Sequence, residues 1–132
     1  MIIKKLERKA TILCAMGYYD MFCGFPVLKI QLRYDDAIDG KRERYQVIFF
    51  QFNKESELES CICDLRTVCG FKHLIELKNR SVNVCMYQEE HSTYEDNVEL
   101  IRLEDRETNR IWFPKESGIA DILCNEQTLF VY

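Results

Sequence analysis

Residues 27–34 constrain the fold more than any other part of the chain. Apolar and polar residues alternate along this segment, with Leu28, Ile30, Leu32 and Tyr34 in one phase and Lys29, Gln31 and Arg33 in the other. Successive side chains of a strand point to opposite faces, so the alternation predicts a strand with one dry face and one wet face. Such a strand must bury its dry face against further strands or a helix.

The flanking segments extend this strand into a mainly antiparallel sheet. Residues 9–19 are rich in Thr, Ile, Leu, Met and Tyr and stop before the turn signals of residues 23–26, which predicts a strand and a tight connection. Residues 45–52 are apolar on both faces, as is typical of a central strand. The remaining strand patterns lie at residues 80–88, 99–103, 110–113 and 127–132.

Between these strands the hydrophobic period changes to that of a helix. The apolar residues at helical spacing are Leu58, Cys61, Ile62, Leu65, Val68 and Cys69. Ser56 and Glu59 form a capping-box signature near the start, Gly70 supplies a left-handed stop, and residues 72–77 suggest one extra helical turn. We therefore expect residues 1–132 to form a single α+β domain with one amphipathic helix and a short second helical turn.

Charge and cysteine content exclude several classes of function. The chain has 18 Lys and Arg against 22 Asp and Glu, so its formal net charge of −4 disfavours broad binding to nucleic acid. No apolar stretch approaches the roughly 18 residues that span a bilayer, which argues against a membrane protein. Seven cysteines, an odd number, and the lack of a signal-peptide pattern at the first residues favour a reducing cytoplasm.

The sequence offers little for catalysis. His73 falls in the short helical turn and His91 in a polar loop, and neither stands beside a nucleophile motif. Glycine-rich phosphate loops, dinucleotide-binding loops and zinc deaminase motifs do not occur in the sequence. Cys61 and Cys63 are one residue apart, unlike the two-residue spacing of structural zinc sites. The sequence predicts a protein that is not an enzyme and that has neither cofactor nor metal.

Basic and aromatic residues alternate in two places where strands are expected to end. Arg42 and Arg44 lie in a charged loop, and Arg110 and Trp112 lie in the predicted hairpin. Guanidinium groups neutralise phosphates and aromatic rings stack on bases, so these residues are candidate nucleotide ligands.

Tyr19 and Asp20 complete the candidate set. Tyr19 offers a second ring for stacking, and Asp20 offers an acceptor for a ribose hydroxyl. The alternative interpretation of all six residues is structural, because aromatic residues at strand ends mostly fill cores and arginines in hairpins mostly face solvent.

Three stretches of the chain resemble a family of small phage and prophage proteins. They are Lys9-Ala10-Thr11-Ile12 through Gly17-Tyr18-Tyr19-Asp20, the passage from Cys69-Gly70-Phe71 to Val82-Asn83-Val84, and Ile111-Trp112-Phe113-Pro114-Lys115. With the intervening strands the resemblance covers most of residues 9–115. The family includes anti-Thoeris sponge proteins, so the resemblance implies a protein that sequesters an immune signal of the cyclic ADP-ribose type without catalysis.

The chain departs from the family pattern at two points. Residues 35–45 are charged and contain only Gly40, where the family has a glycine-rich stretch, and Leu74 stands where the family has a tryptophan. A side chain at a glycine position blocks a close approach of phosphate to the backbone. Three outcomes stay open: a different nucleotide, the use of Arg42 and Arg44 side chains in place of backbone, or a protein target.

The resulting expectation is a phage-encoded counter-defence protein that captures a small nucleotide signal in the host cytoplasm. Because pockets for small ligands often lie between subunits, we expect a homo-oligomer. The alternative from another class is a protein–protein inhibitor of a host defence complex, such as an anti-CRISPR, which would present carboxylates to a basic groove. A third interpretation is a phage structural or replication accessory protein.

Overall fold

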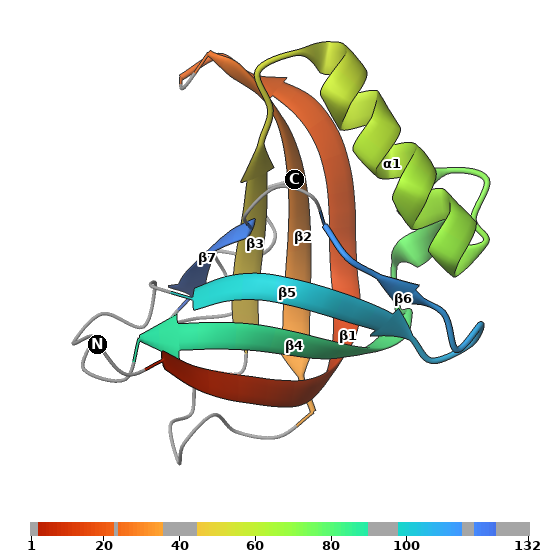
Figure 1. Ribbon diagram of the computed structural model, residues 1–132. Helices are drawn as coiled ribbons and strands as arrows, with labels where there is room; N and C mark the ends of the chain where they lie inside the picture. Colours follow the sequence, from red (N-terminus) through yellow and green to blue (C-terminus); the bar gives the residue numbers. More distant parts are fainter. Residues whose placement is uncertain (1–2, 23, 36–44, 90–97, 115–117, 124–132) are drawn as a thin grey trace.

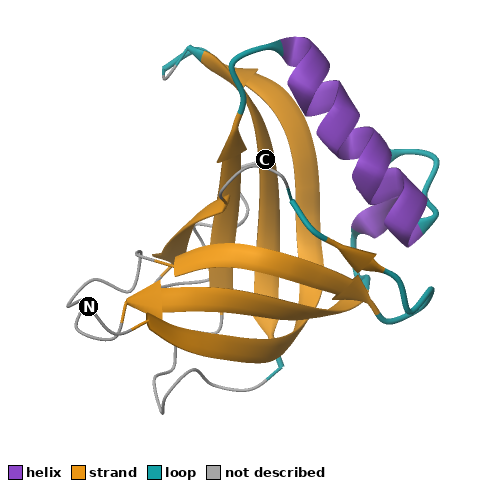
Figure 2. Ribbon diagram, in the orientation of Figure 1, coloured by secondary structure: helices purple, strands orange, loops and turns teal. Residues whose placement is uncertain are grey.

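The described part of the chain has seven strands, one α-helix and one 3-10 turn, which is an α+β fold as the sequence predicts (Figures 1 and 2). The computed structural model describes residues 3–22, 24–35, 45–89, 98–114 and 118–123. The elements are β1 (Ile3–Asp20), β2 (Phe25–Tyr34), β3 (Tyr45–Gln51), α1 (Glu55–Cys69), η1 (Leu74–Leu77), β4 (Ser81–Glu89), β5 (Val98–Asp105), β6 (Ile111–Trp112) and β7 (Gly118–Leu123).

The sheet closes on itself. Its strand order is β4-β1-β2-β3-β7-β5-β6, and β4 also pairs with β5. Six strands therefore form a ring, to which β6 adds at one end of β5. Every pairing is antiparallel, which a ring with an even number of strands permits. Closure directs every second side chain of each strand into a common interior.

Strand β1 belongs to both layers of this ring (Figure 1). Its first half pairs with β4 and its second half with β2. The register with β2 skips Leu13 between Ile12 and Cys14. Such a bulge bends a strand and increases its twist, so Leu13 marks where β1 passes from one layer to the other. The turn before β4 holds this point, because Ile12 exchanges backbone hydrogen bonds of 2.9 and 2.7 Å with Arg80 and Asn79.

The dry face of residues 27–34 is confirmed. Leu28, Ile30, Leu32 and Tyr34 are all fully buried in the core. The expected wet face is wrong in part, because Lys29 and Gln31 are also buried. Lys29 lies in register between Met16 of β1 and Phe49 of β3, so its aliphatic stem shares a face with two apolar side chains.

The interior contains a polar pair at the end of β2. The hydroxyl of Tyr34 donates a hydrogen bond to Oε1 of Gln46 and lies 3.4 Å from Sδ of Met86. Burial raises the pKa of Tyr34 well above its usual value, although the nearby charge of Arg8 acts in the opposite direction. Tyr34 is therefore a neutral hydrogen-bond donor inside the sheet.

Helix α1 packs against β2 and β6 (Figure 1). Leu58 and Leu65 are buried in the core. Gly17 of β1 faces this helix, because a Cβ atom built there would lie 2.9 Å from Cδ1 of Ile62, at the end of its side chain. Gly70 ends the helix at φ 70°, as predicted.

The capping box predicted at Ser56 and Glu59 is wrong, because the helix is capped two residues earlier. The N-cap is Lys54, which makes no side-chain capping hydrogen bond, and Ser56 lies inside the first turn. The backbone carbonyl of Lys54 instead accepts the first helical hydrogen bonds from Glu57 and Leu58. Strand β1 begins earlier than the predicted residue 9, and the last predicted strand, residues 127–132, lies outside the described residues.

Replacing Leu65 with alanine tests how far the helix contributes to the core. Leu65 is 0% exposed, so Leu65→Ala should lower the free energy of unfolding by about 3 kcal/mol through lost burial and a residual cavity. Glu59→Ala on the exposed side of the same helix should change it by less than about 0.5 kcal/mol. Urea denaturation followed by circular dichroism measures both, and equal losses would contradict the packing of α1.

Candidate ligand-binding site

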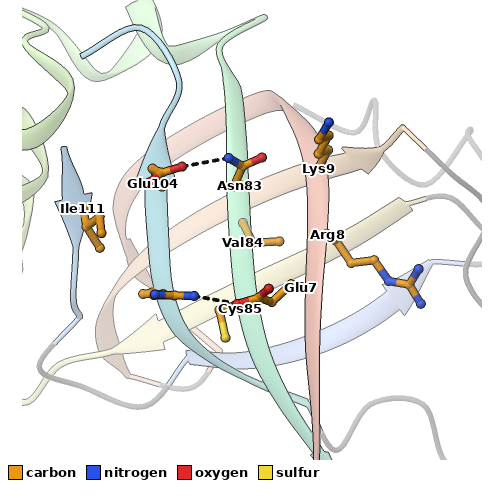
Figure 3. A pocket seen from close by; sticks show the side chains of 9 residues that line it. Glu7, Arg8, Lys9, Asn83, Val84, Cys85, Glu104 and Ile111 are labelled. Carbon is orange, nitrogen blue, oxygen red and sulfur yellow. Dashed lines mark hydrogen bonds and ion pairs between the residues drawn. The ribbon is translucent and has the colours of Figure 1, made fainter. Parts of the chain in front are cut away.

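Two rows of polar side chains cross the outer face of β1, β4 and β5 (Figure 3). The register places Glu7, Cys85 and Arg102 in one row and Lys9, Asn83 and Glu104 in the other. Residues at i and i+2 of a strand share a face, so each strand contributes one member to each row. The rows line an open cavity of about 320 Å³, which Ile111 of β6 borders on one side.

The first row contains an ion pair. One terminal nitrogen of Arg102 lies 2.6 Å from Oε1 of Glu7, and the buried thiol of Cys85 occupies the register position between them. The hydrogen bond to Glu7 raises the pKa of Arg102, so the guanidinium stays charged. An arginine has five N–H donors, which leaves others for a bound molecule.

The second row contains a fixed amide with an unused acceptor. Nδ2 of Asn83 donates a 2.8 Å hydrogen bond to Oε1 of Glu104. Because a carboxylate only accepts, this contact sets the orientation of the amide. Oδ1 of Asn83 is buried and has no hydrogen-bond partner among the described residues. A buried acceptor left in this state favours a ligand that brings an N–H or O–H group.

The outer face of the cavity balances two cations against two carboxylates, whereas the chain as a whole is negative. The cations are Lys9 and Arg102 and the carboxylates are Glu7 and Glu104, while Arg8 alternates to the inner side of β1, where its charge acts on Tyr34. Arg8 extends away from the other side chains (Figure 3). Glu7 forms an ion pair with Arg102, and Glu104 accepts a hydrogen bond from Asn83. The exposed ammonium of Lys9, by contrast, makes no ion pair within the described residues. The site can therefore attract an anionic group to Lys9.

The hairpin between β1 and β2 holds two of the residues predicted from the sequence. Tyr19 is 62% exposed near the tip. Oδ1 of Asp20 accepts a 2.8 Å hydrogen bond from the backbone N–H of Phe22, so this carboxylate stabilises the turn.

The other predicted residues have different surroundings. Arg110 donates a 2.9 Å hydrogen bond to the carbonyl of Thr67 in the last turn of α1. Trp112 is 3% exposed and packs edge-to-face on Phe50 at 5.5 Å between ring centroids. Its predicted role as an open stacking platform is corrected, because β6 pairs with β5 and carries the ring into the core. Arg42 and Arg44 lie outside the described residues.

The structure does not bring the four described candidates into one site. The β1–β2 hairpin and the β5–β6 turn stand on different sides of the molecule (Figure 1). Sequence reasoning instead missed Lys9, Asn83 and Glu104. The sequence does show that alternate residues in three predicted strands, such as Asn83 and Cys85, share a face. It does not show which strands are neighbours, so these residues could not be joined into one site.

Other reactive groups in the described residues have structural surroundings. Glu76 accepts backbone hydrogen bonds from His73 and Lys72, which lower the pKa of Glu76, and His73 completes this capping box at η1. Burial, reinforced by the charge of Asp105, raises the pKa of the Cys69 thiol to about 12. No three His, Cys, Asp or Glu side chains gather around a common point in this part of the chain. None of the described helices is both long and apolar enough to cross a membrane.

Comparisons with known proteins add no family to this geometry. A scan against protein-family models finds no match, and neither the curated proteins nor the solved structures include one similar enough to match. The resemblance to the phage family therefore stays a prediction.

The contact between Asn83 and Glu104 predicts a pH-dependent loss of stability in Asn83→Asp. The new carboxylate would face Glu104, and the like charges would raise their pKa values in the folded state. The free energy of unfolding of the variant should come closest to that of the natural protein near pH 3–4, where the carboxylates are largely protonated. It should fall about 1–2 kcal/mol below that of the natural protein as both carboxylates ionise toward pH 7.

Asn83→Ala is the matched control, since it removes the hydrogen bond without adding charge. Its deficit relative to the natural protein should not vary between pH 4 and pH 7. Urea denaturation at both pH values measures the difference, and a deficit in Asn83→Asp that is equally pH-independent would contradict the assigned contact.

Proposed function

We propose that the protein binds a small nucleotide in the cavity on β1, β4 and β5 and holds it without chemical change. The observation that carries this proposal is the pairing of an exposed cation, Lys9, with a buried unused acceptor, Oδ1 of Asn83, in one open cavity. Together they match a ligand that has an anionic group at one end and N–H or O–H donors at the other. Nucleotides have both.

The size and chemistry of the cavity support a ligand of this class. Its volume of about 320 Å³ is at the small end of the range for ligand sites, so it accommodates one nucleoside phosphate unit, and the rest of a larger ligand such as ADP-ribose would lie over the open mouth of the cavity. Glu7 and Glu104 offer acceptors for sugar hydroxyls, as carboxylates do in ribose-binding sites. Ile111 provides an apolar edge on which a base could lie.

Binding without reaction is also consistent with the residues that line this cavity. The side chains that could act in general acid–base chemistry, Glu7 and Glu104, are each held by a neighbour. Cys85 lies beneath the ion pair and is 3% exposed, whereas a reactive cysteine is partly open to solvent. These contacts favour a site that recognises its ligand and leaves it intact.

The biological role that we propose follows from the phage-family resemblance. A protein that sequesters a nucleotide immune signal acts by stoichiometric removal, so it must bind the signal more tightly than the host effector does. This requires a dissociation constant of about 1 nM, or about −12 kcal/mol. Counter-defence by capture of a signal of the cyclic ADP-ribose or cyclic-nucleotide type is therefore our proposed function.

Isothermal titration calorimetry with ADP-ribose and cyclic ADP-ribose tests the site. Lys9→Glu should weaken binding of whichever probe is bound at least tenfold, because it reverses the only exposed cation among the described lining residues that lacks an ion pair. Binding should also weaken as NaCl rises from 50 to 300 mM. Adenosine, which lacks phosphate, should bind at least tenfold more weakly than the bound probe.

Lys78→Glu is the matched control, since Lys78 is an exposed cation beyond the cavity. It should leave affinity within twofold of the natural protein. Mass spectrometry of the probe after incubation should recover it unchanged. Failure of both probes to bind below 1 mM, an equal effect of the two charge reversals, or conversion of the probe would each reject the proposal.

A further inference from the structure

The second row of the candidate site continues onto a fourth strand. The register pairs Lys9 of β1 with Asn83 of β4, and Asn83 with Glu104 of β5. It also pairs Glu104 with Ile111 of β6. These four side chains line the same cavity, and we call them the long row (Figure 3). At about 4.8 Å between neighbouring strands, the long row spans about 14 Å.

The chemistry of the long row changes from one end to the other. Ile111 is apolar at one end, and Lys9 is cationic at the other. Between them, Glu104 and Asn83 have oxygens that accept hydrogen bonds. A nucleotide has its parts in the same order, with a base, a sugar that carries hydroxyls, and a phosphate. A nucleotide with its phosphate at Lys9 and its base at Ile111 therefore places its sugar over Glu104 and Asn83.

Oδ1 of Asn83 is the acceptor that gains most from a hydroxyl. The hydrogen bond from Nδ2 to Glu104 fixes the amide, so Oδ1 points away from Glu104 and toward β1 (Figure 3). Oδ1 is buried and has no hydrogen-bond partner among the described residues, so the protein without ligand already bears the cost of an unpaired acceptor. A ligand hydroxyl that pairs with Oδ1 removes this cost and does not compete with solvent for it.

We propose that the long row selects ribonucleotides over deoxyribonucleotides through the hydroxyl groups of the sugar. This inference rests on the proposed function and adds which part of the ligand the middle of the site recognises. One hydroxyl of the ribose donates to Oδ1 of Asn83. The neighbouring hydroxyl donates to Oε2 of Glu104, the carboxylate oxygen that Asn83 does not use. A deoxy sugar lacks one of these donors and leaves an acceptor unpaired.

The two acceptors exclude the phosphate from the middle of the long row. The carboxylate of Glu104 repels an anion, and Oδ1 of Asn83 has no proton to donate to a phosphate oxygen. The amino group of a base is the other donor that a nucleotide can bring to Oδ1. Comparison of adenine with hypoxanthine separates that arrangement from ours, because hypoxanthine has a carbonyl where adenine has the amino group.

Access to Oδ1 links this contact to Lys9. Because solvent does not reach Oδ1, a side chain beside it must move before a ligand hydroxyl can bind. Lys9 is the register partner of Asn83 on β1, and its long side chain is exposed and flexible. A phosphate that attracts the ammonium of Lys9 outward opens the approach to Oδ1. Binding of the phosphate and binding of the sugar thus favour each other.

Isothermal titration calorimetry with AMP, 2′-deoxy-AMP, 3′-deoxy-AMP and IMP tests the selection. Each deoxy form should bind more weakly than AMP, and the form that lacks the hydroxyl at Asn83 should lose about tenfold or more in affinity. IMP should bind within about twofold of AMP, because its sugar and phosphate are unchanged and its base lies on an apolar side chain.

Asn83→Leu identifies the hydroxyl that Asn83 recognises. Leucine has a similar size and no acceptor, so this variant should bind AMP and the affected deoxy form with equal affinity. Asn83→Ala removes the same oxygen and should give the same result. Ser81→Ala is the matched control, since Ser81 lies two residues away on the same face of β4 but does not line the cavity. It should keep the full preference for AMP.

Several results would overturn the inference. They are equal affinity of the natural protein for AMP and both deoxy forms, an unchanged preference in both Asn83 variants, binding of ADP-ribose but not of AMP, or a weaker binding of IMP that Asn83→Leu abolishes. Each of these leaves the proposed function standing as long as Lys9→Glu weakens nucleotide binding. Failure of every probe to bind, ADP-ribose and cyclic ADP-ribose included, would instead reject the proposed function itself.

Discussion

The passage of β1 between two layers is the constraint on which the rest of the structure depends. Its bulge at Leu13 lets one strand pair with β4 over its first half and β2 over its second, and these two pairings allow the ring to close. Closure in turn places alternate side chains of each strand inside the ring and the others on its outer surface. Val84 enters the core, whereas its neighbours Asn83 and Cys85 belong to the outer face. The residues of the candidate site thus alternate along β1, β4 and β5 with residues that fill the core.

Local features of this fold could be predicted from the sequence, and long-range ones could not. The buried face of β2 and the glycine that ends α1 follow from the spacing of residues within one segment, so both can be predicted from the sequence alone. The candidate site joins Lys9 to Asn83, which requires knowing that β1 and β4 are adjacent. Trp112 illustrates the same limit, because its burial against Phe50 depends on the pairing of β6 with β5. Alternation gives a face but not a neighbour.

The candidate ligand site depends on side chains that orient one another. The face of β1, β4 and β5 is polar, and its side chains are oriented by one another through the contacts of Arg102 with Glu7 and of Asn83 with Glu104. A sheet built in this way could come to hold a different ligand through changes in a few outer side chains, while the core beneath stayed the same.

The position of β7 in the ring has a consequence for synthesis on the ribosome. This strand, residues 118–123, pairs with β3 on one side and β5 on the other, yet it emerges after both. Until it does, the nascent chain has two unpaired strand edges and an interior open along one seam. Such edges are where extended segments of other chains attach. Closure of the described ring therefore waits until residues 118–123 have been made.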